Sequence, residues 1–281
     1  KAPFRAEHIG SLLRPQSLKD AWKQWETGAI SETEYGSVLD KSISDVVRFQ
    51  EATGLKAVTD GEFRRKSYWS HFLGSVNGME VKKSDFRFKD ANGRERGFLA
   101  PHMNGHLRWT KSVSGKEFDF LNGVTTDTPK LTVPSPSTMH FWRGANTFSR
   151  CFYRDEESYF VDLEKFFKEE IKDLIARGCT YLQFDEVALP MLCDEKVRSM
   201  VIERGGDPQQ LAARYAQLIN SSIAGLSKEI RMGLHLCRGN LRGSWLSEGG
   251  YETIASLIFD KVEVDTFFLE YDDFRSGGFE P

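Results

Sequence analysis

Hydrophobic positions follow two alternating patterns along the chain. Apolar residues three or four positions apart predict helices near residues 18–25, 31–53, 155–177, 207–219 and 245–259. Ser31 with Glu34 three residues on predicts a capping box at the start of the second helix, and Asp207 before Pro208 predicts an N-cap. Short apolar runs that end in polar residues predict strands near residues 6–11, 57–62, 105–109, 131–137, 181–186, 232–237 and 264–270. Strand and helix alternate from end to end, which predicts an α/β fold built on a parallel sheet.

The positions of the polar residues favour a closed sheet, a (βα)8 TIM-type barrel, over a doubly wound one. No G-x-G-x-x-G motif follows the first strand, which weakens a dinucleotide-binding reading. Seven chemically active residues lie at or just beyond the predicted carboxyl ends of strands, the face that carries the active site in such barrels. They are Ser11, Glu62, Ser135, Asp185, His235, Cys237 and Glu270.

The 281 residues are enough for one barrel, and we expect a single catalytic domain over residues 1–281. Residues 77–130 break the pattern, and their charged segments predict a hairpin-like excursion from the barrel. Only seven strands can be counted, so we expect the eighth βα unit to be missing, with a gap between the first and seventh strands.

Composition limits the partners to small molecules. The net charge is −3, and 28% of the residues are charged, so nothing favours nucleic acid or an anionic membrane. Four irregularly spaced cysteines do not form a secreted disulfide framework, and no apolar run reaches membrane-spanning length. We therefore expect a cytoplasmic protein, with oligomerisation left open.

The strand at residues 232–237 carries the clearest candidate chemistry. Because side chains alternate along a strand, His235 and Cys237 share one face, while Met232, Leu234 and Leu236 form an apolar row on the other. An imidazole and a thiol so placed can both reach one ion, and this pair suits zinc. The alternative for an isolated pair is a buried histidine beside an inert cysteine.

An ordered set of motifs links these residues to a known family. The motifs are His8-Ile9-Gly10-Ser11, Asp60-Gly61-Glu62, Pro134-Ser135-Pro136-Ser137, Phe184-Asp185-Glu186-Val187-Ala188-Leu189-Pro190, His235-Leu236-Cys237 and Leu269-Glu270. With them the chain resembles the C-terminal catalytic barrel of cobalamin-independent methionine synthase, and most closely its short single-barrel relatives.

The resemblance implies a role for each of these motifs. It implies a Zn²⁺ held by His235, Cys237 and Glu270. The amino-acid end of a thiol substrate would be held by Ile9, Ser11, Glu62 and Asp185, and we assign Ser135, Ser137 and Trp142 to the methyl donor. For the two acids the alternative is a structural salt bridge, for example from Glu62 to Arg64 or Arg65.

The chain departs from the long enzymes of that family in three ways. Their fourth zinc ligand is a cysteine farther along, which Cys151, Cys179 and Cys193 do not match, and Cys179 and Cys193 are expected to be buried. The long enzymes have an N-terminal barrel that helps to bind the folate donor. The segment after Cys237 also follows the short relatives, so the methyl donor stays open.

The leading hypothesis is a zinc-dependent methyltransferase that methylates homocysteine from methyltetrahydrofolate or a methylcorrinoid, giving methionine. The second is a zinc-dependent alkyltransferase that joins another thiol, such as coenzyme M, to an epoxide. Glu62 and Asp185 favour the first, because coenzyme M has no ammonium group. A porphyrin-binding decarboxylase barrel would not need His235 and Cys237, and a non-enzymatic binding module is the remaining alternative.

Overall fold

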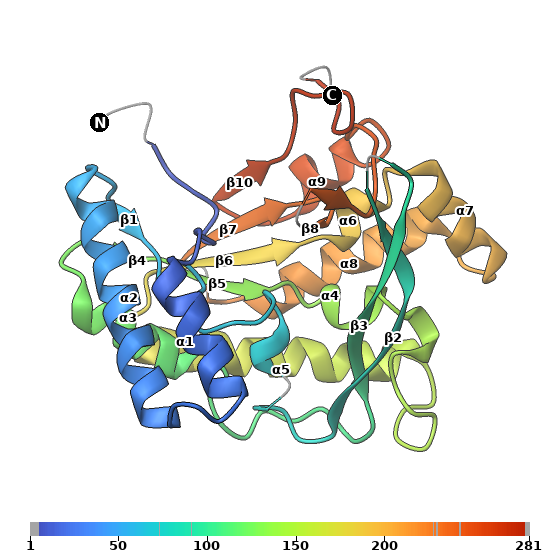
Figure 1. The fold of residues 1–281 in the computed structure, drawn as a ribbon. Helices are drawn as coiled ribbons and strands as arrows, with labels where there is room; N and C mark the ends of the chain where they lie inside the picture. Colours follow the sequence, from blue (N-terminus) through green and yellow to red (C-terminus); the bar gives the residue numbers. More distant parts are fainter. Residues whose placement is uncertain are drawn as a thin grey trace.

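A parallel sheet lies at the centre of the computed structural model, which describes residues 6–72, 74–90, 92–226, 228, 230–241 and 243–278. Its order is β10 (Thr266–Leu269), β7 (Arg231–Leu236), β6 (Tyr181–Glu186) and β5 (Leu131–Pro134). Two short strands, β1 (Ala57–Val58) and β4 (Thr128–Pro129), pair in parallel beside it. The α/β class predicted from the alternating pattern is therefore correct (Figure 1).

The short pair continues the central sheet. Strands β4 and β5 are separated only by Lys130, whose N–H donates to the carbonyl of Val58 at 2.8 Å. One extended run therefore pairs with β1 along its first half and with β6 along its second half. All these strands are parallel, so their carboxyl ends meet at one edge.

Helices cover the sheet where the sequence predicts them. The long ones are α1 (Gln16–Glu26), α2 (Glu32–Ala52), α5 (Glu156–Ala176) and α8 (Pro208–Ile223). The predicted capping box of Ser31 and Glu34 begins α2, and the Asp207 side chain caps α8. The shorter ones are α3 (Gly115–Val124), α4 (Thr138–Phe141), α6 (Ala188–Met191), α7 (Glu195–Glu203), α9 (Ala255–Lys261), η1 (Ser70–Phe72) and η2 (Gly144–Asn146).

The predicted excursion is a long antiparallel hairpin of β2 (Met79–Lys89) and β3 (Glu95–Met103). A small pair, β8 (Asn240–Leu241) and β9 (Ser244–Trp245), extends its sheet. Figure 1 shows the hairpin at the end toward which β5, β6 and β7 point. The strand predicted near residues 105–109 is wrong, since no strand is assigned there. Strand β3 already ends at Met103, and an irregular segment leads from it to α3.

The helix predicted over residues 245–259 is too long. Helix α9 begins only at Ala255, because Trp245 belongs to β9 and two glycines, Gly249 and Gly250, interrupt the helical pattern. Among the described residues the core forms one large cluster around β5, β6, β7, α5 and α8, and a smaller one under α1 and α2. No helix within the described ranges is long and apolar enough to cross a membrane.

A closed barrel is not found in the strands that the structure describes. The first predicted strand, near residues 6–11, is extended but is not part of a ladder, because side chains take its carbonyl groups. Lys130 Nζ donates to the carbonyl of His8, Gln183 to that of Ile9, and Thr59 to that of Gly10. This segment runs alongside β6, from Glu7, which accepts from the Tyr181 hydroxyl at the start of that strand, to Ser11 in the site described next.

Candidate functional site

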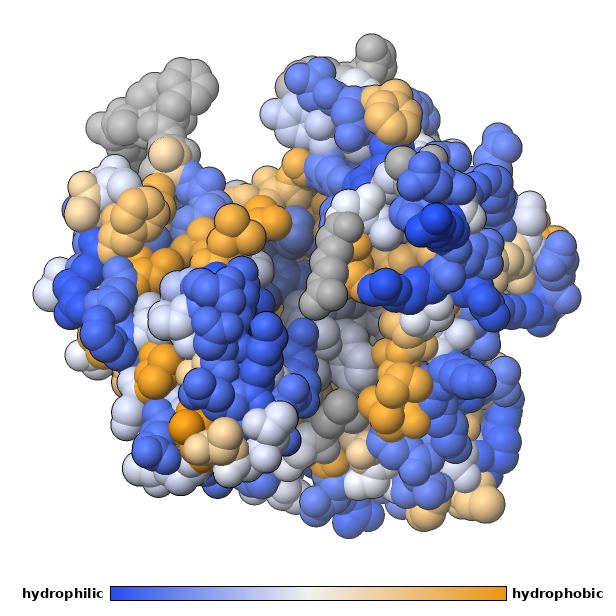
Figure 2. Space-filling model, viewed as in Figure 1, coloured by the Kyte–Doolittle hydropathy of each residue, from blue (hydrophilic) through white to orange (hydrophobic). Residues whose placement is uncertain are grey.

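A cavity of about 780 Å³ lies at the carboxyl ends of the parallel strands. Figure 2 shows this face hollowed between its two flanks. Six of the seven polar residues singled out at strand ends line the cavity; the seventh, Ser135, is fully buried. The six are Ser11, Glu62, Asp185, His235, Cys237 and Glu270, and Ile9 and Trp142 join them.

The loop after β1 places Glu62 in the cavity wall. The backbone turns sharply there, with φ of +67° at Gly61 and +58° at Glu62, a conformation that non-glycine residues seldom adopt. Arg14 stabilises the turn by donating from Nη2 to the carbonyls of Glu62 (2.7 Å) and Arg65 (2.6 Å). Strain held in place at a cavity is typical of a functional position.

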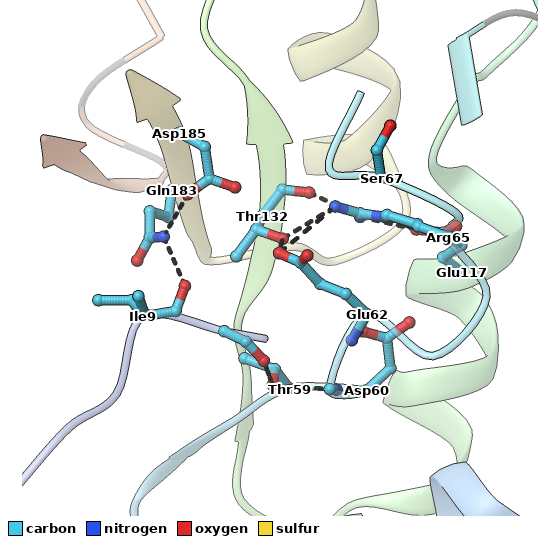
Figure 3. Close-up of polar contacts among 12 residues, drawn as sticks. Ile9, Thr59, Asp60, Glu62, Arg65, Ser67, Glu117, Thr132, Gln183 and Asp185 are labelled. Carbon is cyan, nitrogen blue, oxygen red and sulfur yellow. Dashed lines mark hydrogen bonds and ion pairs between the residues drawn. The ribbon is translucent and has the colours of Figure 1, made fainter. Parts of the chain in front are cut away.

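Glu62 is buried, and among the described residues its nearest cation is Arg65 (Figure 3). The neighbouring Arg65 guanidinium donates twice to Glu117, at 2.7 and 2.9 Å, whereas it lies 3.8 Å from Glu62. Thr132 donates its hydroxyl to the Glu62 carboxylate at 2.8 Å. Burial raises the pKa of Glu62 to about 7; Arg65 opposes that rise, and the charge of Asp185 adds to it.

Asp185 connects the cavity to the candidate metal ligands. Its Oδ1 accepts a hydrogen bond from Gln183 at 2.8 Å and lies 3.0 Å from Nδ1 of His235. The same Gln183 amide donates to the carbonyl of Ile9 at 2.7 Å (Figure 3). If Nδ1 of His235 donates to Asp185, its Nε2 carries the lone pair, which is the arrangement found at metal-binding histidines.

His235, Cys237 and Glu270 line the same cavity, on β7 and at the ends of β7 and β10. Imidazole, thiol and carboxylate are the donor types that zinc binds, so the residues fit this metal chemically. They are not arranged around a common point: within the described ranges no three His, Cys, Asp or Glu side chains form a group that could hold a metal ion. Burial raises the pKa of Cys237, so without a metal it is a neutral thiol.

The three residues assigned to the methyl donor are placed differently from one another. Trp142 lines the cavity and packs edge-on against Phe98 of the hairpin. Ser135 and Ser137 are fully buried, and the Ser137 hydroxyl donates to Glu186. Cys179 and Cys193 are buried, as predicted.

Sequence reasoning missed several residues of the cavity wall. The hairpin contributes an apolar side, and Arg14, Tyr68 and Asn240 contribute polar groups. Burial raises the pKa of Tyr68 well above its usual value, so its phenol stays protonated and can donate a hydrogen bond. No spacing rule could have found these residues, because hairpin docking and turns bring them to the site.

Comparison with known proteins agrees with the motifs. Residues 4–267 match the family described as "Cobalamin-independent synthase, Catalytic domain". Two Bacillus subtilis proteins, YxjH and YxjG, both described as uncharacterized, are each 36% identical over all of this chain and 74% of their own length. A methionine synthase of Pyrococcus abyssi is 27% identical over 94% of this chain and 67% of its own.

Solved structures extend the likeness to the fold. A crystal structure from Listeria monocytogenes, assigned to the vitamin-B12 independent methionine synthases, superposes with a TM-score of 0.75 at 28% identity. It covers 98% of this chain, and the chain covers 75% of it. The resemblance stated from the motifs is thus confirmed: the chain belongs to the cobalamin-independent methionine synthase family, through that family's catalytic domain.

Proposed function

We propose that this protein is a zinc-dependent methyltransferase that transfers a methyl group from methyltetrahydrofolate, or from a methylcorrinoid, to the thiol of homocysteine, giving methionine. One observation carries the proposal. A single cavity brings the zinc-type donors His235 and Cys237 together with the carboxylates of Glu62 and Asp185. A homocysteine-like ligand needs both, a site for its sulfur and anions for its ammonium group.

The names of the relatives support the reaction class. Besides the archaeal methionine synthases, a yeast 5-methyltetrahydropteroyltriglutamate–homocysteine methyltransferase is 22% identical over 96% of this chain. The two Bacillus relatives have no described activity, so they do not choose between donors.

In this proposal His235, Cys237 and Glu270 hold the zinc ion at the carboxyl ends of β7 and β10. When bound, zinc lowers the pKa of a substrate thiol, which then reacts as the thiolate at neutral pH. Asp185 fixes the ring of His235 through the 3.0 Å contact at Nδ1. The fourth ligand is predicted to be a cysteine, and we assign none of Cys151, Cys179 and Cys193 to that position.

The amino-acid end of the substrate is held by other residues of the same cavity. Glu62 and Asp185 pair with the ammonium group, and the Ser11 hydroxyl with backbone N–H groups near Ile9 binds the carboxylate. Glu62 suits this role because the carboxylate is buried while the nearest guanidinium is bound to Glu117. A buried carboxylate whose nearest cation is bound more closely to another acid gains from a ligand that brings a cation of its own.

The methyl donor would lie against the apolar side that the hairpin and Trp142 form. Trp142 is the best placed of the three residues assigned to the donor. Ser135 and Ser137 act there only indirectly, since both are buried and Ser137 is bound to Glu186.

The second candidate, an alkyltransferase acting on coenzyme M and an epoxide, has one observation in its favour. Arg14 lines the cavity, and a guanidinium can bind a sulfonate. The first candidate is favoured because Arg14 already donates to two backbone carbonyls, and because two carboxylates would repel a sulfonate.

The test compares thiols and donors on one preparation. Zinc-loaded protein is incubated with homocysteine and, in turn, methyltetrahydrofolate, its triglutamate and methylcobalamin; a parallel reaction has coenzyme M and an epoxide. Mass spectrometry should detect methionine, lost after zinc removal and restored by zinc. Product only from coenzyme M would select the second candidate, and no product from any thiol would overturn both.

A further inference from the structure

An arginine lies against the third of the proposed zinc ligands. Arg275 lies five residues after Glu270, and its Nη2 forms an ion pair with Oε1 of the Glu270 carboxylate. The other oxygen, Oε2, accepts the backbone N–H of Arg238 at 3.0 Å. Both carboxylate oxygens therefore already have donors.

Asn240 joins this arginine to the cysteine. Its Oδ1 accepts from Nη1 of Arg275 at 2.7 Å. Its Nδ2 lies 3.4 Å from Sγ of Cys237 and 3.4 Å from Oε2 of Glu270. A single amide thus links the guanidinium to two of the three proposed ligands.

The turn that carries Arg275 is itself well defined. The Asp273 carboxylate accepts the N–H groups of Arg275 and Ser276, at 3.0 and 2.6 Å. Arg275 is only 8% exposed, so its charge is held among protein groups and is little screened by water. Arg238 has a different role, since it donates to the carbonyls of Gly249, Glu270 and Ser276.

We propose that Arg275 is the counter-ion of Glu270 in the metal-free protein. Its guanidinium holds the Glu270 carboxylate and competes with a divalent metal ion for it. This inference rests on the proposed function, because it takes Glu270 as a metal ligand. A guanidinium and a divalent cation drawn to one carboxylate repel each other at short range. Metal binding therefore has to shift the Arg275 side chain away from Glu270. In the metal-free protein Arg275 supplies the cation that pairs with the Glu270 carboxylate.

The experiment measures zinc affinity without using catalysis. Zinc is titrated into metal-free Arg275→Met in competition with a chromophoric chelator, with Arg275→Lys beside it. We expect Arg275→Met, which keeps the length of the side chain and removes its charge, to bind zinc at least about tenfold more tightly than the unmodified protein. The lysine variant keeps the charge and should stay close to the unmodified protein.

Thermal unfolding gives a second readout. Metal-free Arg275→Met should have a lower melting temperature than the metal-free unmodified protein, because Glu270 loses its cation. Added zinc should raise the melting temperature of this variant by more than it raises that of the unmodified protein. Arg48→Met serves as the matched control, since Arg48 is an exposed arginine on α2 whose ion pair in the described part of the chain is with the exposed Asp45. It should change neither quantity.

Two outcomes separate the inference from the function on which it rests. If Arg275→Met folds but binds zinc no more tightly than the unmodified protein, while Cys237→Ser loses zinc, the competition is overturned and the metal site stands. If Cys237→Ser binds zinc as well as the unmodified protein, the metal lies elsewhere and both proposals are overturned.

Discussion

Replacing Glu62 by glutamine separates a substrate-binding acid from a structural one, because the two roles predict opposite changes in stability. Burial raises the pKa of Glu62 from 4.5 to about 7. At about 1.4 kcal/mol per pKa unit, this shift corresponds to a cost of about 3 kcal/mol for keeping the carboxylate charged in the folded protein. Glutamine can still accept the hydrogen bond from Thr132 but never carries the charge.

The sign of the pH dependence follows from that shift. The folded protein holds the Glu62 proton more tightly than the unfolded chain does. The stabilising contribution of Glu62 is therefore fully present below pH 4.5 and is lost as the pH rises through about 7. We expect Glu62→Gln to raise the free energy of unfolding by about 1 to 3 kcal/mol at pH 8 and to change it little at pH 4.5.

Binding should change in the opposite direction. Loss of a charge-assisted partner for the substrate ammonium should weaken homocysteine binding by about 1 to 3 kcal/mol, while a thiol without an amino group is nearly unaffected. Homocysteine affinity of the unmodified protein should also fall as the pH drops below about 7, because Glu62 is then protonated. Urea unfolding at both pH values and titration calorimetry with homocysteine and coenzyme M measure these effects.

Glu117→Gln is the matched control for this substitution. Glu117 is buried at a similar level but makes two hydrogen bonds with Arg65, so its loss leaves a buried guanidinium short of its partner. This variant should lose about 3 to 5 kcal/mol of stability. If Glu62→Gln behaves in the same way, with lower stability at pH 8 and unchanged homocysteine affinity, then Glu62 is a structural partner of Arg65 and the substrate role is refuted.

Four further substitutions test the rest of the site. The unmodified protein should bind about one zinc per chain, and Cys237→Ser and His235→Ala should each lose it while keeping their circular dichroism spectra. Cobalt bound to the unmodified protein should give thiolate absorption that shifts when homocysteine is added. An unchanged spectrum contradicts thiol activation. Asp185→Asn should weaken homocysteine binding by about 1 to 3 kcal/mol and coenzyme M binding hardly at all, and equal losses by calorimetry would make this acid structural. Ser137→Ala should cost about 1 to 3 kcal/mol in urea unfolding, because Glu186 loses a buried donor, with the donor KM unchanged; a raised KM would instead place Ser137 in the donor site.

Local patterns predicted the elements whose signals are contained in a few neighbouring residues. The capping box at Ser31, the Asp207 cap and strands β6 and β7 are examples. Helix α3 was missed because it lies inside an irregular charged stretch, and the strand near residues 105–109 was wrong because the hairpin ends before it. Closure of the sheet was beyond local patterns, since it depends on where the carbonyls of residues 8–10 find donors.

The site was easier to predict than the closure of the sheet. Parallel strands bring their carboxyl ends to one edge whether or not the sheet closes, so residues at those ends meet in either case. That is why six of the polar residues singled out line one cavity although the barrel is not found in the described strands. Arg14 reaches the same cavity from the segment before α1, and the backbone carbonyls that it binds, those of Glu62 and Arg65, are distant in sequence. The barrel with a missing eighth unit, the single domain and the cytoplasmic location stay predictions.

Asp185 makes the two halves of the proposed site dependent on each other. Its carboxylate touches the ring of His235 at 3.0 Å, and its charge also acts on Glu62 across the cavity. An ammonium group bound between Glu62 and Asp185 would offset the charge that raises the pKa of Glu62, and would change the electrostatic support that Asp185 gives to His235. Substrate and metal should therefore not bind independently, and reciprocity requires that each alter the affinity of the other by the same factor. Because Asp185 is the group that both contacts share, Asp185→Asn should remove this coupling even where it leaves binding of the metal alone intact.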